Sequence, residues 1–432
     1  MNKNSIAMKI KSLISAKLWA FFLVAILFLA ACSNSLENQT KKERSSFQNQ
    51  DINQNSASKQ LRGSILLWHD EKINEDQSQR TVRNYQQINP DVNIIVEIVR
   101  KEELLKRFLQ QFRAGLSPNI LLVDYDLMFE FIRINSLMAI DPKIINLGDI
   151  LPAALAQVTY QGKVYGIPGA IFTQVLCYDK NTINKDQLPK NLDDILNQAK
   201  AGYTFGMSSN FQDTFWGIQI FGGKIFDDQG RFSLKPGSWA TWMTWLQSAK
   251  NLPNIILSSS IAALEKSFMQ GNLDYFVCDA ASIFNLKKTL VKDNLGVTIL
   301  PGGSEYPAGP LLYSKVLVIP NNFSPRQTAI TLDFARFITN KQQQQRGAID
   351  VGSFIPPNKT IRLDRRLFPI QATLEEQARN AVAIPLRDIP KAEIIFPIGE
   401  TLYQQVLEGT ISPKEGGEQF LKLSRQALQE KL

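Results

Sequence analysis

Short apolar runs alternate with stretches of helical spacing from Gly63 onward. Such runs predict buried strands, and apolar residues repeated at helical spacing predict helices packed on them. Strands and helices are expected in turn at residues 64–68, 74–88, 92–99, 101–114, 120–123 and 127–135. The first helix stops at Asn89-Pro90 and the second at Gly115, both ordinary helix ends. This β-α-β-α-β order is typical of a parallel sheet covered by helices.

Polar and aromatic residues directly follow the first and third of these strands. Trp68, His69 and Asp70 close the first strand, and Asp124, Tyr125 and Asp126 follow the third. Ligands of open parallel sheets gather at the carboxyl ends of the strands. We therefore expect these six residues to lie at one binding site.

The segment 160–180 indicates a passage from one sheet to another. Gln161-Gly162 predicts a turn, and residues 163–167 predict a short strand. Pro168-Gly169 should end its pairing, because proline has no N–H to donate and glycine is conformationally loose. The β-rich run 171–178 then begins a second sheet. On the pattern alone, a strand-turn-strand unit within one domain remains an alternative.

The first 31 residues have the pattern of a secretory signal. Four lysines and no acidic residue accompany the apolar run 18–31, which is shorter than the roughly 20 residues that span a bilayer. The run ends in Leu29-Ala30-Ala31-Cys32, which resembles the lipobox of bacterial lipoproteins. That resemblance implies that Cys32 is lipidated and anchors an exported protein to the membrane, facing the periplasm or the cell exterior. Ordinary secretory cleavage beside an incidental cysteine is the alternative.

A polar stretch separates this signal from the rest of the chain. Residues 32–60 are rich in Asn, Gln, Ser and Lys, with Phe47 as the only aromatic residue, so they predict a flexible tether. The remaining chain of about 370 residues exceeds the size at which a single hydrophobic core keeps growing. Two domains are therefore expected after residue 60.

Charge and cysteine content exclude two classes of protein. The net charge of +8 includes the four lysines of the signal, and no basic stripe with interleaved aromatic residues follows, so nucleic-acid binding is not expected. Only Cys177 and Cys278 follow Cys32, too few for a disulfide framework in a chain this long. Both lie in apolar runs, so we expect two buried free thiols, with a single bridge as the alternative.

Catalytic and metal motifs are missing from the sequence. His69 is the only histidine, which excludes a histidine-based zinc site. The segment 227–230, Asp-Asp-Gln-Gly, lacks the ligand spacing of a calcium loop and predicts a hairpin turn. We therefore expect no cofactor, no metal and no enzymatic activity. Paired carboxylates of a glycosidase need not be close in sequence, so a hydrolase acting on surface polysaccharide is an alternative.

Ten segments in chain order resemble extracellular solute-binding proteins of the maltose-binding type. They read LLWHD, NPDVNI, AGLSPNILLVDY, SLMAIDP, GKVYGIP before an apolar strand and YDK, FGGKIFDDQGRF, MQGNLDYFVCD, LGVTILPGG, KVLVIPNN and LEGTISPKEGGEQF. The resemblance implies a two-lobe α/β fold of the type II periplasmic-binding-protein class, each lobe a mainly parallel sheet flanked by helices. Lobe 1 would comprise residues 61–168 and 315–365, and lobe 2 residues 169–314 and 366–432.

The resemblance also implies a function and a set of partners. The protein would be the substrate-binding lipoprotein of an ABC importer, a monomer that captures a small solute between its lobes and delivers it to the membrane permease. A sugar or oligosaccharide is the expected solute. A ligand-free interaction lipoprotein is a further alternative.

The ligand site is expected where the two lobes meet. Aromatic faces would come from Trp68, Tyr165, Phe172 and Trp216, and hydrogen bonds from His69, Asp70, Asp124, Tyr125, Gln174 and Asp279. Core packing is an equal alternative for Tyr165, Phe172 and Trp216, and a core stripe is expected for Trp239, Trp242 and Trp245. The family commonly has Gly-Pro-Trp, with a sugar-stacking tryptophan, where this chain has Ala280-Ala281-Ser282. That departure weakens the sugar assignment.

Overall fold

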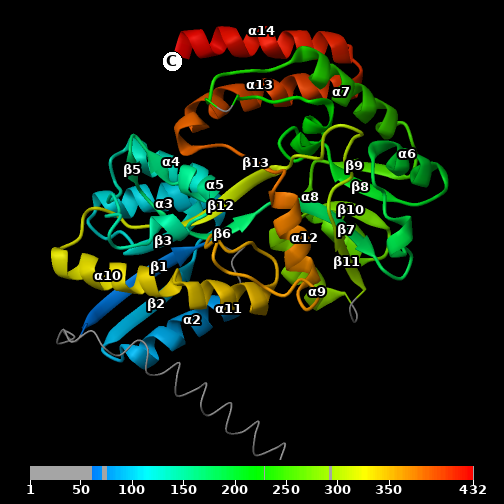
Figure 1. The fold of residues 1–432 in the computed structure, drawn as a ribbon. Coiled ribbons are helices and arrows are strands. Elements are labelled where there is room, and N and C mark those ends of the chain that lie inside the picture. The colour runs from blue at the N-terminus through cyan, green and yellow to red at the C-terminus, as the bar shows by residue number, and fades with distance from the viewer. Residues whose placement is uncertain (1–60, 71–74, 228, 291–293, 432) are drawn as a thin grey trace, which may run out of the picture. The chain divides into compact units, whose positions relative to one another are not determined.

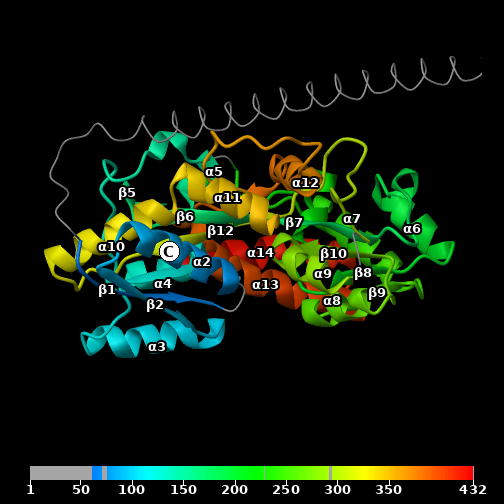
Figure 2. The same cartoon turned by 90° about the horizontal axis from the view of Figure 1, so that it is seen from below.

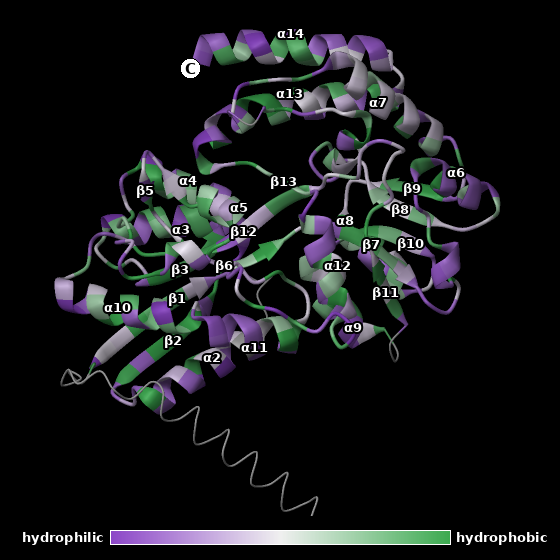
Figure 3. Ribbon diagram, viewed as in Figure 1, coloured by the Kyte–Doolittle hydropathy of each residue, from purple (hydrophilic) through white to green (hydrophobic). Residues whose placement is uncertain are grey.

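The computed structural model describes residues 61–70, 75–227, 229–290 and 294–431. The predicted signal segment, the lipobox cysteine Cys32 and the tether lie outside the described residues. Within the described part, two main sheets carry the fold, and Figure 3 shows that hydrophobic residues are concentrated in their strands. No helix among the described residues is long and apolar enough to cross a membrane.

The first sheet has the order β13-β12-β3-β1-β2, with β6 paired on β12 (Figure 1). Its strands are β1 (Gly63–His69), β2 (Val92–Ile98), β3 (Ile120–Asp124), β6 (Ile167–Phe172), β12 (Leu311–Val318) and β13 (Val382–Ala383). Strand β1 is parallel to β2 and β3, which confirms the β-α-β-α-β prediction. Strand β12 is antiparallel to β3 and returns the chain to this sheet.

Helices cover this sheet on both sides, because each buries an apolar face on the strands. They are α2 (Glu75–Ile88), α3 (Lys101–Arg113), α4 (Tyr125–Arg133), α10 (Pro325–Ile338) and α11 (Lys341–Val351). Figure 2 shows α3 on one side of the sheet and α10 with α11 on the other. The short helix α5 (Pro152–Ala156) follows α4 and precedes a separate hairpin of β4 (Thr159–Tyr160) and β5 (Lys163–Val164).

Strand β6 corrects the prediction that the chain leaves the first sheet at Pro168. The strand continues through Pro168 and Gly169 to Phe172, and Pro168 lies opposite Val316 of β12. A proline is tolerated there because, in the described residues, Pro168 is paired on the β12 side alone, so no N–H is needed on its other side; the further bridge of β6 to Ile355 is made by Ile171. The register shifts between Lys315 and Val316, next to the proline.

The second sheet has the order β11-β7-β10-β8-β9. Its strands are β7 (Gln174–Asp179), β8 (Phe205–Ser208), β9 (Ile255–Ser258), β10 (Tyr275–Asp279) and β11 (Leu295–Thr298). The chain passes from β6 to β7 at Thr173, so the predicted second sheet is confirmed. The predicted lobe boundaries at residues 168, 315 and 366 remain a proposal.

Seven longer helices accompany the second sheet along the chain. They are α6 (Leu192–Lys200), α7 (Pro236–Lys250), α8 (Ile261–Met269), α9 (Ile283–Thr289), α12 (Pro369–Ala378), α13 (Ile389–Glu408) and α14 (Pro413–Lys431). Helices α13 and α14 pack on α7. The three tryptophans of α7 are buried in this core, as their helical spacing predicts.

A disulfide joins Cys177 of β7 to Cys278 of β10, with their Cα atoms 5.8 Å apart. The prediction of two free thiols is therefore wrong. The strands are antiparallel neighbours, and Cys278 lies opposite Val175, two residues before Cys177. This diagonal placement brings the two side chains together on one face of the sheet. Sequence spacing could not show it, because the cysteines are 101 residues apart and their register depends on the whole lobe.

Candidate functional site

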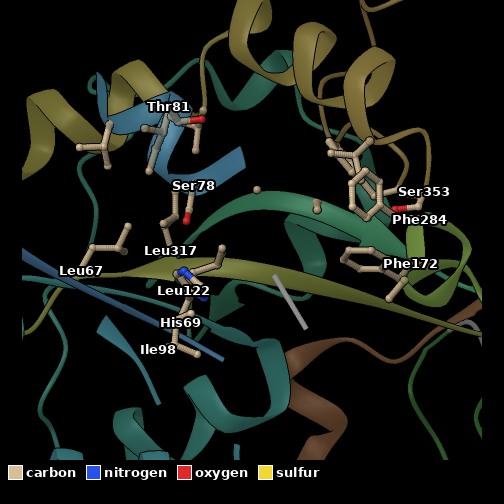
Figure 4. Close-up of a pocket in the computed structure, with 18 of the residues that line it drawn as sticks. Leu67, His69, Ser78, Thr81, Ile98, Leu122, Phe172, Phe284, Leu317 and Ser353 are labelled. Atoms are coloured by element: carbon tan, nitrogen blue, oxygen red, sulfur yellow. The ribbon is translucent and has the colours of Figure 1, made fainter. Parts of the chain in front are cut away.

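Two chambers lie next to each other at the stacked rings of Phe172 and Tyr313. The polar chamber is a cavity of about 510 Å³, whose lining includes Lys101, Asp124, Tyr125, Asp126, Gln174, Gln212, Asp213, Asp279, Tyr313, Glu393 and Phe396. The apolar chamber is a cavity of about 360 Å³, whose lining includes Leu67, His69, Leu122, Phe172, Ala281, Phe284, Leu317, Phe334 and Phe354 (Figure 4). Residues of both sheets line the polar chamber, whereas the first sheet and helices, including α9 beside the second sheet, line the apolar one.

The ends of strands and helices place the functional groups of the polar chamber. On the side of the first sheet, Asp124 is the last residue of β3, and Lys101 is the first residue of α3. On the side of the second sheet, Gln174 begins β7 and Asp279 ends β10. Because β7 and β10 are antiparallel, these two residues are direct register partners. Helix α13 adds Phe396, an aromatic ring beside those of Tyr125 and Tyr313.

A buried ionic network closes the base of this chamber. The Lys315 ammonium, 1% exposed, forms ion pairs with Asp70 and with Asp124 Oδ1, the latter at 2.9 Å. Lys101 Nζ lies 2.6 Å from Asp124 Oδ2. Strand register explains the contact, because Lys315 is the β12 partner of Asp124. The network fixes the ends of β1, β3 and β12 relative to one another.

The two lysines determine the charge state of Asp124. Burial tends to raise the pKa of this carboxyl group, but Lys315 and Lys101 outweigh it and hold the pKa below its usual value. For Lys101, burial tends to lower the pKa, and Asp124 outweighs that effect and raises it. Asp124 therefore stays ionised at neutral pH, with most of its charge already balanced by lysine.

Tyr313 links the two sheets and separates the two chambers. Its hydroxyl group donates to both carboxylate oxygens of Asp279, at 3.0 and 2.8 Å. Its ring stacks on Phe172, with centroids 5.4 Å apart. Burial, and then the negative charge of Asp279, raise the pKa of Tyr313 well above its usual value, so the hydroxyl group remains a donor. Tyr313 lines the polar chamber and Phe172 the apolar one.

Asp126 and Glu393 add accessible carboxylates to the polar chamber. Both side chains are exposed to solvent and line the cavity. Loss of solvation within the chamber, and then the nearby Asp124, raise the pKa of Asp126. Burial, and then Glu130, raise the pKa of Glu393. Carboxylates, amides and aromatic side chains in a concave site suit a ligand with several hydroxyl groups and apolar C–H faces.

The structure brings most of the predicted polar residues to these chambers. Asp124, Tyr125, Gln174 and Asp279 line the polar chamber. His69 and Phe172 line the apolar chamber. Asp70 lies between them in its ion pair with Lys315.

Three predicted aromatic residues lie elsewhere. Trp68 and Trp216 are 0% exposed, so neither ring is open to a ligand in this structure. Trp68 packs under the Arg107 guanidinium, 4.6 Å from the ring centroid, and Trp216 packs edge-on against Trp242. Tyr165 packs against the core of the first sheet. Alternation along β1 explains the first case, because Trp68 faces away from Leu67 and His69, which line the apolar chamber.

Sequence reasoning missed several residues of the polar chamber. Lys101 follows β2, and Gln212 and Asp213 follow β8, so the rule that ligands gather at strand ends could have found all three. Phe396 lies inside α13, where an aromatic residue predicts core packing, and no sequence signal separated it from the core.

Comparison with known proteins agrees with this architecture. Residues 81–369, more than half of the chain, match the family described as bacterial extracellular solute-binding protein. The galactooligosaccharide-binding protein of Bacillus subtilis (strain 168) is 22% identical over 282 residues. The match covers 61% of this chain and 66% of that protein, so this chain spans slightly less than two thirds of the length of its relative.

Solved structures show the same fold. The GacH receptor of Streptomyces glaucescens, studied unliganded and with acarbose, superposes with a TM-score of 0.73 at 18% identity, covering 85% of this chain and 99% of that one. The maltose-binding periplasmic protein MalE from Listeria monocytogenes, in complex with maltose, superposes with a TM-score of 0.70 at 19% identity. The match covers 85% of this chain and 98% of that one. The type II fold expected from the sequence is confirmed, and the family's extracellular character indicates an exported protein. This chain belongs to the bacterial extracellular solute-binding protein family.

Proposed function

We propose that this protein is the substrate-binding component of an ABC importer and that it captures a sugar or oligosaccharide in the polar chamber. The observation that carries the proposal is the convergence of Asp124, Gln174 and Asp279 from both sheets, and of Phe396 from α13, on one cavity of about 510 Å³. The relatives support it, because they are named for galactooligosaccharide and maltose or were studied with acarbose. Sugars combine dense hydroxyl groups with apolar ring faces, which match these side chains.

Ligand binding would shift the equilibrium between an open and a closed arrangement of the two sheets toward the closed one. A ligand that contacts Asp124 of the first sheet and Asp279 of the second favours the arrangement in which both groups reach it, by its differential affinity. The crossings at Thr173 and between β11 and β12 are the places for a hinge. The membrane permease would recognise the closed form of a monomer.

Sugar binding should raise the melting temperature of the protein. We expect stabilisation by members of a galactooligosaccharide and maltooligosaccharide series, and none by polyols, polyamines or phosphate esters. Linkage predicts about 2.7 kcal/mol at a ligand concentration a hundredfold above the dissociation constant. A thermal-shift panel measures this directly. Stabilisation by a charged compound alone would contradict the sugar assignment.

The same panel tests the role of Phe396. Phe396→Ala should weaken sugar binding by about 1–3 kcal/mol if its ring covers a sugar face. Phe284→Ala is the matched control, because it removes the same ring from the apolar chamber. Release of shorter glycans during incubation would instead favour the hydrolase alternative.

We further propose that Cys32 carries the lipid anchor, on the strength of the lipobox-like ending of the signal. Cells that express the wild type should incorporate labelled palmitate into this protein and retain it in the membrane fraction. Cys32→Ala should lose the label and leave that fraction, since a single thiol is the acylation site. Equal partitioning of the two forms, with no label in the wild type, would exclude the anchor.

A further inference from the structure

We propose that the apolar chamber is a second ligand site, which takes a small apolar molecule that carries one hydrogen-bond donor. This chamber lies beyond the Phe172–Tyr313 stack from the polar chamber, and the proposal is independent of the sugar site. Its cavity of about 360 Å³ is within the usual size range of small-molecule sites.

Apolar side chains from the first sheet and from helices form the walls of this chamber. Leu67, Leu122 and Leu317 come from three adjacent strands of the first sheet, and Phe284 comes from α9 beside the second sheet. Figure 4 shows the leucines and His69 grouped on one side and Phe172 with Phe284 on the other. Most of the lining side chains are apolar, so a sugar in this space would turn many of its hydroxyl groups toward groups that cannot pair with them, which is unfavourable. An aromatic or aliphatic body fits these walls better.

Among the polar side chains that line the chamber, which also include Ser78, Thr81, Asn285, Thr339 and Ser353, His69 is the one in the described residues with a buried atom that lacks a hydrogen-bond partner. The side chain is 0% exposed, and its Nδ1 lies 2.7 Å from the Asp70 carbonyl oxygen. A carbonyl oxygen can only accept, so Nδ1 carries the proton. In the neutral ring Nε2 is then an acceptor.

The acceptor at Nε2 determines the chemistry of the ligand. Nε2 is buried, and no atom of the described residues hydrogen-bonds to it. Buried acceptors in folded proteins are nearly always paired. A ligand hydroxyl or N–H group in the chamber would supply that partner, whereas an ether or a ketone would not. The site should therefore distinguish a donor-bearing molecule from its methylated form.

The test compares 2-naphthol with 2-methoxynaphthalene, which has the same rings and no donor, by isothermal titration calorimetry on the full chain. We expect one 2-naphthol per protein and an affinity about fivefold higher than for the ether, the ratio that corresponds to one hydrogen bond of about 1 kcal/mol. His69→Phe should make the two affinities equal. Phe396→Ala, in the polar chamber, should leave both unchanged.

A cavity-filling variant keeps the test decisive if His69→Phe fails to fold. Ala281 lines the chamber, so Ala281→Phe should abolish binding of both probes, with circular dichroism confirming its fold. The proposal is overturned if 2-naphthol does not bind, if both probes bind the wild type equally, or if folded Ala281→Phe binds 2-naphthol like the wild type.

Discussion

Lys315→Met should lower the free energy of unfolding by about 3–5 kcal/mol, because it removes one partner from a buried ion pair and leaves the other without compensation. The variant would leave Asp70 and Asp124 close together without the ammonium group that now lies between them. Methionine has a similar length, so the effect should come from charge rather than from lost volume. Urea denaturation followed by circular dichroism measures the difference.

A matched control removes a lysine from an exposed ion pair. Lys288 Nζ lies 3.7 Å from Asp76 Oδ2, and both side chains are more than half exposed, so Lys288→Met should change stability by less than about 1 kcal/mol.

The pH dependence of the stability gives a second check on the network. The pKa of Asp124 is lowered in the folded state, so its stabilising contribution is present above the unfolded pKa and is lost as the pH falls through the folded value. If Lys315→Met is as stable as Lys288→Met, the network does not stabilise the fold.

Removing the disulfide should have an effect of similar size. The Cys177→Ala/Cys278→Ala double variant opens a loop closed over 101 residues, and chain entropy predicts a loss of about 4.7 kcal/mol for a loop of that length. Typical measured losses are about 2–5 kcal/mol. Thermal and urea denaturation of the double variant against the wild type will measure it.

Thiol labelling checks the bond itself. In the Cys32→Ala background, a denatured sample without reductant should take up no thiol label, and a reduced sample should take up two. Two labels without reductant would show that the cysteines are free and would remove the basis of the stability prediction.

The sequence predicted those features that depend on local pattern. Alternating strands and helices gave the first sheet, and the rule for strand ends placed Asp124 in the polar chamber. The same rule treated Trp68 and His69 alike, although alternation along β1 turns them to opposite faces of the sheet. Successive side chains of a strand point to opposite faces, so extending this alternation to the end of β1 would have placed Trp68 and His69 on different faces.

Features that depend on pairing between distant segments could not be predicted. Lys315 reaches Asp70 across 245 positions because β12 returns antiparallel to β3, and the sequence does not determine that register. The Cys177–Cys278 bridge could not be predicted for the same reason, because it depends on the register of β7 and β10. Pro168 was misread because its effect depends on whether the strand is at an edge, which only the assembled sheet shows.

The most direct test of the proposed function is a crystal structure of the protein with the oligosaccharide that gives the largest thermal shift. We predict sugar density in the polar chamber, with hydroxyl groups hydrogen-bonded to Asp279 or Gln174 and one sugar face on Phe396. Density confined to the apolar chamber or to the outer surface, with the polar chamber occupied by water, would contradict the proposal.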